Sequence, residues 1–259
     1  MLKNTALLIC VSSLFFCISS ASHAIVNMDG LLFGAEQKQG FSGDVELLFS
    51  GTSGNSETTT TAMDTQLNWI TPQYINLLLM SYKYGKANGV SNVDNAFAHY
   101  RHIHNINQTL DWEAFAQLEQ NQFTRLSYRG LLGGGLRFSV WQTAAHKGFL
   151  GIGAFYSKEQ IDYRAGYTDE GTYDQTRANF YFLSRYKATP TIRWSNAIYY
   201  QPRINQVSDF RALLQSKLDF KINDSLNFRV SLDIAHDSEP SQGVKKTDTS
   251  YNTGLKWSF

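Results

Sequence analysis

The sequence predicts an all-β fold, a twelve-stranded antiparallel transmembrane β-barrel of the bacterial outer membrane. The last eleven residues, 249–259, alternate polar and apolar side chains and end on Phe259, as membrane-spanning β-strands do. The first residues are typical of an export signal. Aromatic residues make up 14% of the chain, which suits a barrel with aromatic girdles at two lipid interfaces. Fold, compartment and export route therefore follow from the same few features.

The N-terminus predicts a cleaved signal peptide over residues 1–24. A lysine precedes a mostly apolar stretch at 6–18, and small residues follow up to Ser22-His23-Ala24, the expected cleavage site. The apolar stretch is shorter than the roughly 20 residues that a spanning helix needs. Cleavage removes both cysteines, Cys10 and Cys17, so the mature chain is predicted to have neither a disulfide nor a thiol metal site.

The mature chain is expected to consist of a short N-terminal periplasmic segment, residues 25–39, and a barrel over residues 40–259. Cleavage removes one lysine, which leaves 22 basic residues against 22 acidic ones. A net charge of zero argues against nucleic acid as a partner. The expected partners are outer membrane lipid and, during biogenesis, the barrel assembly machinery, which would read Phe259 as its signal. A monomer is expected.

Alternation with period two divides the barrel region into twelve strands. In order, the predicted spans are 40–51, 57–70, 73–84, 92–104, 109–120, 125–140, 147–158, 174–187, 191–201, 208–221, 225–237 and 247–259. In the eleventh, Leu226, Phe228 and Val230 share one face and Asn227 and Arg229 the other, so the apolar face is expected to meet lipid and the polar face the lumen. The phase of the fourth and seventh strands stays open, because Ala96, Ala98, Leu150, Ile152 and Ala154 fall where polar residues are expected.

The lengths of the connections predict the orientation. Connections after even-numbered strands are short and are expected to be periplasmic turns, whereas several after odd-numbered strands, such as 85–91 and 159–173, are long and are expected to be extracellular. All five tryptophans then fall near periplasmic strand ends, as an aromatic belt of Trp69, Trp112, Trp141, Trp194 and Trp257. A soluble periplasmic β-sandwich is the alternative, but only a closed barrel leaves no unpaired strand edge in lipid.

Three stretches resemble a known family. Gly51-Thr52-Ser53-Gly54-Asn55-Ser56-Glu57-Thr58, the stretch from Asp237 to Thr249, and the closing Gly254 to Phe259 resemble the YdiY-like family, whose members are named as salt-induced outer membrane proteins and form a domain of unknown function. The resemblance runs from about Phe41 to Phe259. It implies an outer membrane barrel, and it implies no established activity.

Charged residues expected to face the lumen are unevenly distributed. Acidic side chains come from the first, second and fifth strands: Asp44, Glu46, Asp64, Asp111, Glu113 and Glu119. Basic side chains come from the sixth and the eighth to eleventh strands: Arg129, Arg137, Arg177, Arg185, Arg193, Arg211, Lys217 and Arg229, with Lys187 and Lys221 beside them. Lys83 and Asp219 break the pattern.

An acidic wall that faces a basic wall has two interpretations. The first is a narrow passive channel whose transverse field orients small polar or zwitterionic solutes, in an envelope component that the family name links to salt or osmotic stress. The second is a lumen closed by pairing between the two walls, in a plugged barrel with a structural or surface-interaction role.

Catalytic and cofactor motifs lead to no site. His102 and His104 share a strand face and could supply two metal ligands, but they have neither a cysteine nor a third ligand, so a solvated turn face is favoured. Gly133-Gly134-Gly135 lacks the Lys-Ser or Lys-Thr of a phosphate loop and is expected to relieve crowding in a strand. Without a Gly-x-Ser-x-Gly elbow, an outer membrane hydrolase is the least favoured alternative. We predict no enzyme, no catalytic residue, no cofactor and no metal.

Overall fold

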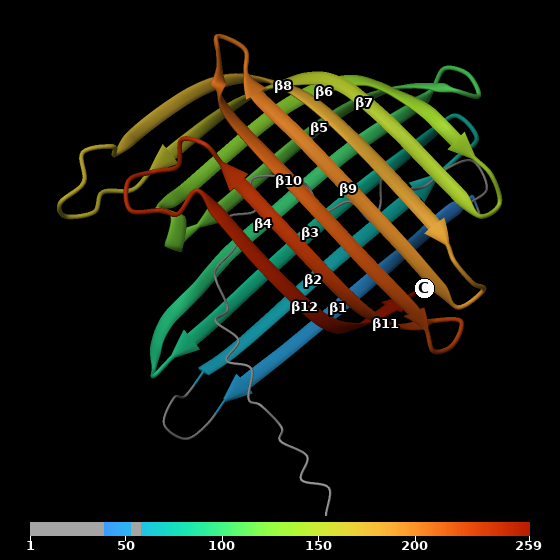
Figure 1. Cartoon of the computed structure of the whole chain (residues 1–259), viewed down its shortest axis with the longest axis horizontal. Helices are drawn as coiled ribbons and strands as arrows, with labels where there is room; N and C mark the ends of the chain where they lie inside the picture. The colour runs from blue at the N-terminus through green and yellow to red at the C-terminus, as the bar shows by residue number, and fades with distance from the viewer. Residues whose placement is uncertain (1–38, 53–57) are drawn as a thin grey trace, which may run out of the picture.

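Antiparallel strands form a closed barrel in the computed structural model, which describes residues 39–52 and 58–259 (Figure 1). The strands are β1 (Gly40–Thr52), β2 (Thr58–Ile70), β3 (Tyr74–Ala87), β4 (Val90–Asn105), β5 (Leu110–Asn121), β6 (Leu126–Gln142), β7 (His146–Ile161), β8 (Gly171–Lys187), β9 (Ile192–Arg203), β10 (Gln206–Lys221), β11 (Leu226–Asp237) and β12 (Thr247–Ser258), with one short helix, η2 (Gln122–Thr124). The predicted fold class is confirmed. The predicted signal peptide and most of the 25–39 segment lie outside the described residues.

Strand boundaries lie within three residues of the predicted ones. The largest differences are in β3, β7 and β8, each of which extends further than predicted at the end away from the short turns. The predicted loop over 85–91 is wrong, because Asn88 and Gly89 have φ values of 50° and 78° and form a two-residue hairpin turn that needs positive φ at both positions. The predicted loop over 159–173 shrinks to 162–170, and Glu159 belongs to β7.

The closing strand pairs with the first one, and β12 lies beside β1 in Figure 1. The register runs from Asp44 opposite Ser258 to Leu47 opposite Leu255. Beyond it, Gly43 and Phe259 exchange backbone hydrogen bonds of 3.0 and 2.9 Å. The Phe259 ring lies where Gly43 has no side chain, since a Cβ on Gly43 would come 2.5 Å from its Cζ. The terminal aromatic residue thus packs against the seam that it closes.

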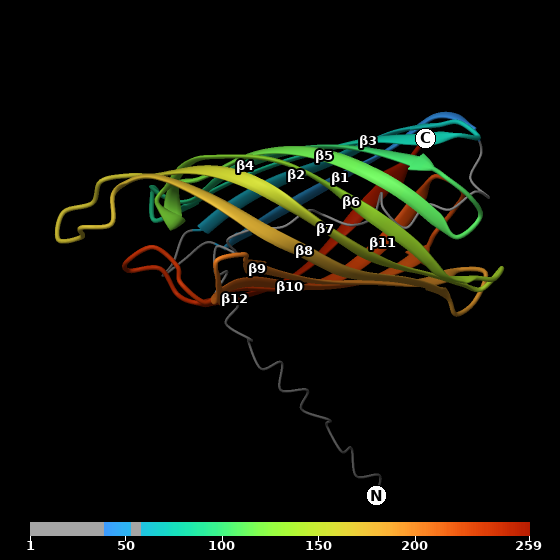
Figure 2. The same ribbon diagram turned by 90° about the horizontal axis from the view of Figure 1, so that it is seen from above.

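The interior of the barrel is filled on one side. The barrel is flattened in Figure 2, and in a ring of twelve strands β3 and β4 lie opposite β9 and β10. Buried apolar side chains from β3 and β4 and from β7 to β10 form one cluster, which we call the apolar plug: Leu77, Leu79, Ile103, Phe149, Tyr181, Leu183, Ala197, Tyr199 and Leu213. Opposite walls therefore touch across the lumen.

The outer surface is apolar, the reverse of a soluble protein. In β7, Leu150 and Ile152 are 48% and 50% exposed and face outward, whereas Phe149 is buried and faces inward. These exposures fix the phase of β7, which the sequence left open. The five tryptophans are 39% to 58% exposed and lie near strand ends at the end of the barrel with the short turns, the short-turn end. Among the described residues no helix is both long and apolar enough to cross a bilayer. Short turns mark the periplasmic end of such barrels.

Candidate functional site

Charged side chains fill much of the lumen, and most are paired. A buried ion is tolerated when an opposite charge and hydrogen bonds compensate for its lost hydration. The lumen therefore divides into three parts that differ in what the paired charges do: an ion chain near the loop end, a filled side next to the apolar plug, and a row of cavities.

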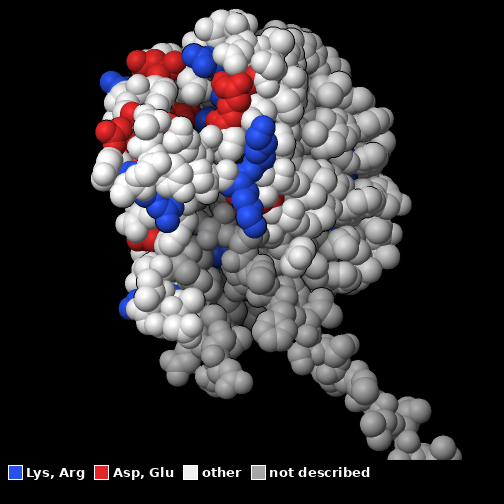
Figure 3. All heavy atoms as spheres, turned by 60° about the vertical axis from the view of Figure 1, so that its left-hand side comes forward, with Lys and Arg blue, Asp and Glu red and all other residues white. Residues whose placement is uncertain are grey.

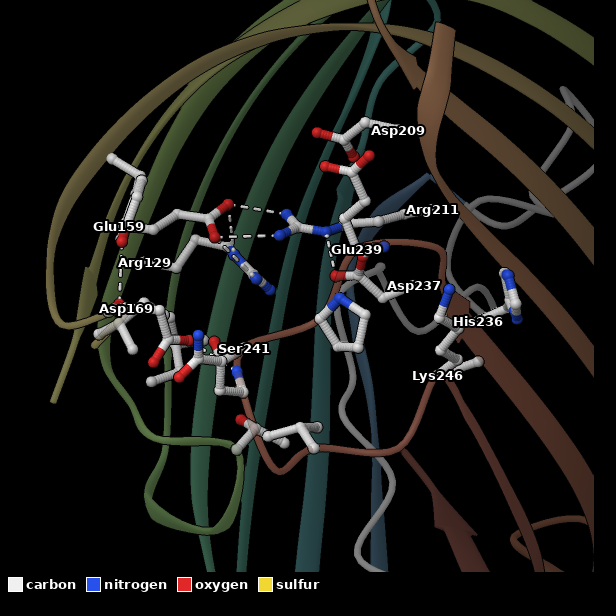
Figure 4. A pocket seen from close by; sticks show the side chains of 18 of the residues that line it. Arg129, Glu159, Asp169, Asp209, Arg211, His236, Asp237, Glu239, Ser241 and Lys246 are labelled. Carbon is white, nitrogen blue, oxygen red and sulfur yellow. Dashed lines mark hydrogen bonds and ion pairs between the residues drawn. The ribbon is translucent and has the colours of Figure 1, made fainter. Parts of the chain in front are cut away.

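An ion chain of alternating charges crosses the lumen near the loop end: Glu119, Arg129, Glu159, Arg211 and Asp237 on β5, β6, β7, β10 and β11. Figure 4 shows the last four of them. Arg211 donates two hydrogen bonds to Glu159, of 2.7 and 3.0 Å. Arg129 donates to Glu159 at 3.1 Å and to Glu119 at 3.2 Å, and Arg211 donates to Asp237 at 2.9 Å. Glu159 thus joins two walls that are distant in the sequence.

Arg101 and Glu113 fill the lumen next to the apolar plug. Their ion pair measures 3.0 Å, and both side chains are 1% exposed. The Tyr181 hydroxyl of β8 donates to the same Glu113 oxygen at 2.8 Å, while the Arg101 guanidinium lies 4.7 Å from the centre of the Phe115 ring. Gly151 makes room for Tyr181, because a Cβ there would come 2.0 Å from Tyr181 Cζ. These contacts fill this side of the lumen in the part of the chain that the structure describes.

A row of cavities remains along β1–β3 and β10–β12, and at the short-turn end it reaches β7 to β9. The middle cavity, of about 100 Å³, is lined by Glu46, Asp64, Lys217, Arg229, Asp233 and others. The periplasmic cavity, of about 320 Å³, opens at the short-turn end and is lined by Asp44, Arg185, Arg193, Asp219, Arg229, Lys256 and others. A third cavity, of only about 30 Å³, lies between them. It shares Glu46, Asp64 and Arg229 with the middle cavity, and Asp44, Arg229 and Lys256 with the periplasmic cavity.

Ion pairs narrow the small third cavity, which we call the constriction. Arg229 donates to both oxygens of Asp219, at 2.6 and 3.0 Å, and to Glu46 at 3.2 Å. Lys256 lies 3.1 Å from Asp44, which also accepts a hydrogen bond from Ser258. The space left between these pairs suits one or two water molecules.

The outer cavity, of about 320 Å³, lies at the loop end between the ion chain and the loops 162–170 and 238–246. Figure 3 shows charged side chains gathered around this end and an uncharged wall beside it. Arg125, with φ of 61°, donates to Asp169 at 2.5 Å and to the Gln242 carbonyl at 3.2 Å. Asp169 also accepts from the Gln242 N–H at 2.6 Å. Three connections thus meet at one carboxylate, which we call the loop latch.

The loop latch is expected to slow the cleavage of the outer loops 162–170 and 238–246 by trypsin. Burial disfavours the charged form of Asp169, but hydrogen bonds from Arg125 and the Gln242 N–H outweigh it, so the pKa of Asp169 lies below its usual range. A lowered pKa means that the latch is intact above the ordinary carboxyl pKa and is lost as the pH falls through the lowered one. We expect Asp169→Asn to speed tryptic cleavage at Arg164 and Lys245 several-fold at neutral pH. Glu170→Gln in the same loop is the control, and equal cleavage of both variants would count against the latch.

The structure places the predicted lumen residues on inward positions, in different surroundings. Asp44, Glu46, Asp64, Lys217 and Arg229 line the row of cavities, and Arg185 and Arg193 line the periplasmic cavity. Glu119, Arg129 and Arg211 belong to the ion chain, and Glu113 pairs with Arg101. Arg137 lies 3.8 Å from Asp111, and Arg177 lies 2.6 Å from Asp209.

The expected separation into an acidic and a basic wall is wrong. Besides Asp219, the expected exception, further acidic residues occupy the wall that was expected to be basic: Glu159, Asp209, Asp233 and Asp237. Sequence reasoning missed Glu159 because it was assigned to a loop, and Arg101 because the phase of its strand was open. The signal for Glu159 was its alternation with Phe155 and Ser157, both buried.

His102 and His104 lie on the outer face, where they pack instead of forming a solvated turn face. Their rings lie 5.2 and 5.5 Å from the Trp112 ring, and His102 shares a 2.8 Å hydrogen bond with Asn76. No group of three potential metal ligands occurs in the described part of the chain. Gly133 lies between Phe115 and Phe155, each 2.6 Å from where its Cβ would be, so glycine there does relieve crowding.

Comparisons with known proteins support a barrel of this kind. The family model described as "Protein of unknown function, DUF481" matches residues 45–259, which confirms the predicted resemblance. No curated protein matches the chain. The structure of a NanC porin is similar with a TM-score of 0.50 and 10% identity, over 83% of this chain and 98% of that one. This likeness shows a shared fold alone.

Two further solved structures are similar at lower scores. A KdgM porin in complex with disordered oligogalacturonate has a TM-score of 0.42 and 11% identity, over 85% of this chain and 99% of that one. The translocator domain of the autotransporter NalP from Neisseria meningitidis has a TM-score of 0.46 and 9% identity, over 86% of this chain and 90% of that one.

Proposed function

The chain belongs to the family described as "Protein of unknown function, DUF481", and we propose that this member is a narrow passive channel for small polar solutes. The route runs along the row of cavities, through the constriction between the middle and periplasmic cavities. We also propose export with cleavage after Ala24, insertion by the barrel assembly machinery, a monomeric state and no enzymatic activity. A link to salt or osmotic stress stays a prediction from the family name.

The row of cavities is the observation that carries this proposal. Successive cavities share Glu46, Asp64 and Arg229, and then Asp44, Arg229 and Lys256, so the side chains of the constriction lie between neighbouring cavities. Charges of both signs line the route, and such rings favour small polar or zwitterionic solutes over apolar ones. A water-sized constriction would exclude larger solutes.

A plugged barrel with a structural or surface-interaction role is the second candidate. The apolar plug and the ion chain favour it, because each spans the lumen from one wall to the other. In this alternative the outer loops, held by the loop latch, present the functional surface.

Conductance across planar bilayers tests the proposal. We expect small discrete steps from the refolded wild type, and larger, more cation-selective steps from Arg229→Ala, because the smaller side chain widens the constriction and removes a positive charge beside Glu46 and Asp219. Lys221→Gln, which removes a charge from an exposed turn, should behave as the wild type does. If neither wild type nor Arg229→Ala conducts in any of several salts, the channel is refuted and the plugged barrel stands.

A further inference from the structure

Two opposite charges in the middle cavity are not paired with any side chain. Lys83 of β3 and Asp64 of β2 line this cavity, and both are half-buried. Among the residues that the structure describes, neither side chain makes a hydrogen bond or an ion pair. A charge that loses part of its hydration needs an opposite charge or hydrogen bonds in return. Each of the two therefore gains from a bound group of opposite sign.

The other charged side chains of this cavity already have partners: Glu46, Glu119, Lys217, Arg229 and Asp233. Glu46, for example, accepts a hydrogen bond from Arg229 at 3.2 Å, and Asp233 accepts one from Gln215 at 2.8 Å. The charges that the middle cavity offers to a solute are therefore one lysine and one aspartate.

Strand register places these two charges next to each other. Asp64 lies directly opposite Ser81, and Lys83 follows Ser81 by two positions, on the same face of β3. Asp64 and Lys83 are therefore diagonal neighbours, whose backbones lie roughly 7 to 8 Å apart in such sheets. The Asp64 carboxylate is close enough to attract Lys83, yet the two do not form an ion pair. A solute with a charge at each end can bridge them.

Neutral polar side chains complete the lining: Ser81, Asn95, Ser231, Ser250 and Asn252. Ser81 lies directly opposite Asp64, and Asn95 lies directly opposite Lys83. Hydroxyl and amide groups both donate and accept hydrogen bonds, so they can bind either end of such a solute. The lining also includes Asn121, the last residue of β5, at the loop end.

The volume of the cavity limits the size of the solute. The middle cavity measures about 100 Å³, and a protein cavity of roughly 150 Å³ holds one benzene molecule. A zwitterion of the size of glycine or alanine therefore fits. The constriction that follows measures only about 30 Å³, so such a solute is retained in the middle cavity.

We infer that the middle cavity is a binding site for a small zwitterion, with its ammonium group on Asp64 and its carboxylate on Lys83. Hydrogen bonds in which both groups are charged are stronger than neutral ones. A simple cation leaves Lys83 without an anion, and a simple anion leaves Asp64 without a cation, so a solute that carries both charges is preferred. The inference rests on the proposed channel, because this cavity lies on its route, and it names the class of solute.

Saturation-transfer NMR on the refolded full barrel, in deuterated detergent, tests the site. The ligands are L-alanine, propionate, which lacks the ammonium group, and ethylamine, which lacks the carboxylate. We expect alanine to bind about tenfold more tightly than either, because it alone makes both charge-assisted contacts. Lys86→Gln removes a lysine from an exposed position of β3 and should bind all three ligands as the wild type does.

Two variants separate the site from a general loss of structure. Asp64→Asn should weaken the binding of alanine and ethylamine and leave that of propionate unchanged. Lys83→Gln should weaken the binding of alanine and propionate and leave that of ethylamine unchanged. Wild-type barrel that binds alanine no more tightly than the two single-charge ligands would overturn the inference, and so would variants that lose all three ligands equally.

Conductance of the same preparation keeps this inference distinct from the proposed function. Wild-type barrel that binds alanine through Asp64 and Lys83 but does not conduct refutes the channel and keeps the site. Wild-type barrel that conducts but does not bind alanine refutes the site and keeps the channel.

Discussion

Replacement of Glu159 by glutamine is expected to destabilise the barrel by about 3 to 5 kcal/mol, the cost of removing one partner from a buried ion pair. Glu159 accepts hydrogen bonds from Arg129 and Arg211, and all three side chains are at most 6% exposed. Without the carboxylate, two buried guanidinium groups face each other across the lumen. Urea unfolding in lipid vesicles, followed by tryptophan fluorescence, measures the change.

Two variants complete this test. Glu170→Gln removes a carboxylate from the exposed 162–170 loop, so its free energy of unfolding should stay within about 0.5 kcal/mol of the wild type. Glu159→Gln/Arg211→Gln removes one of the opposed cations too and should recover part of the loss. If Glu159→Gln is as stable as Glu170→Gln, the ion chain does not hold the two walls together.

Much of the fold follows from the sequence because lipid enforces strict alternation along each strand. From Leu226 to Ile234 of β11, apolar residues alternate with inward polar ones, and the predicted spans of β11 and β12 differ from the observed ones by one residue at most. Alternation fails where a strand carries apolar residues on both faces. In β4 the inward Ile103 and the outward Ala96 and Ala98 are all apolar, so the phase, and with it Arg101, could not be assigned.

The closure of the lumen could not be predicted from the sequence. It depends on contacts such as Arg211 with Glu159 and Tyr181 with Glu113, which join residues 52 and 68 positions apart. Alternation with period two predicts which side chains point inward, but it does not predict the distance between facing walls of the barrel. That distance depends on small residues such as Gly151, which leaves space for the Tyr181 ring. The hairpin turn at Asn88-Gly89, in contrast, could be predicted, because Asn-Gly is a preferred sequence of two-residue hairpin turns.

Replacement of Tyr181 by alanine is expected to open the filled side of the lumen and to raise the single-channel conductance several-fold. Tyr181 is 4% exposed, its ring centre lies 5.2 Å from that of Tyr199, and its hydroxyl bonds Glu113 on the opposite wall. Removal of the ring leaves a space bordered by Gly151, which has no side chain to fill it. The same change should cost about 3 to 5 kcal/mol, as other truncations of buried aromatic residues do.

Tyr181→Phe separates the two effects of that replacement. It keeps the ring, so the lumen stays filled and the conductance should equal that of the wild type. It removes one hydrogen bond from Glu113, which still has Arg101 at 3.0 Å, and should cost only about 1 kcal/mol. A folded Tyr181→Ala barrel that conducts no more than Tyr181→Phe would mean that the apolar plug is not what blocks this side. Any conduction would then be confined to the constriction at Arg229.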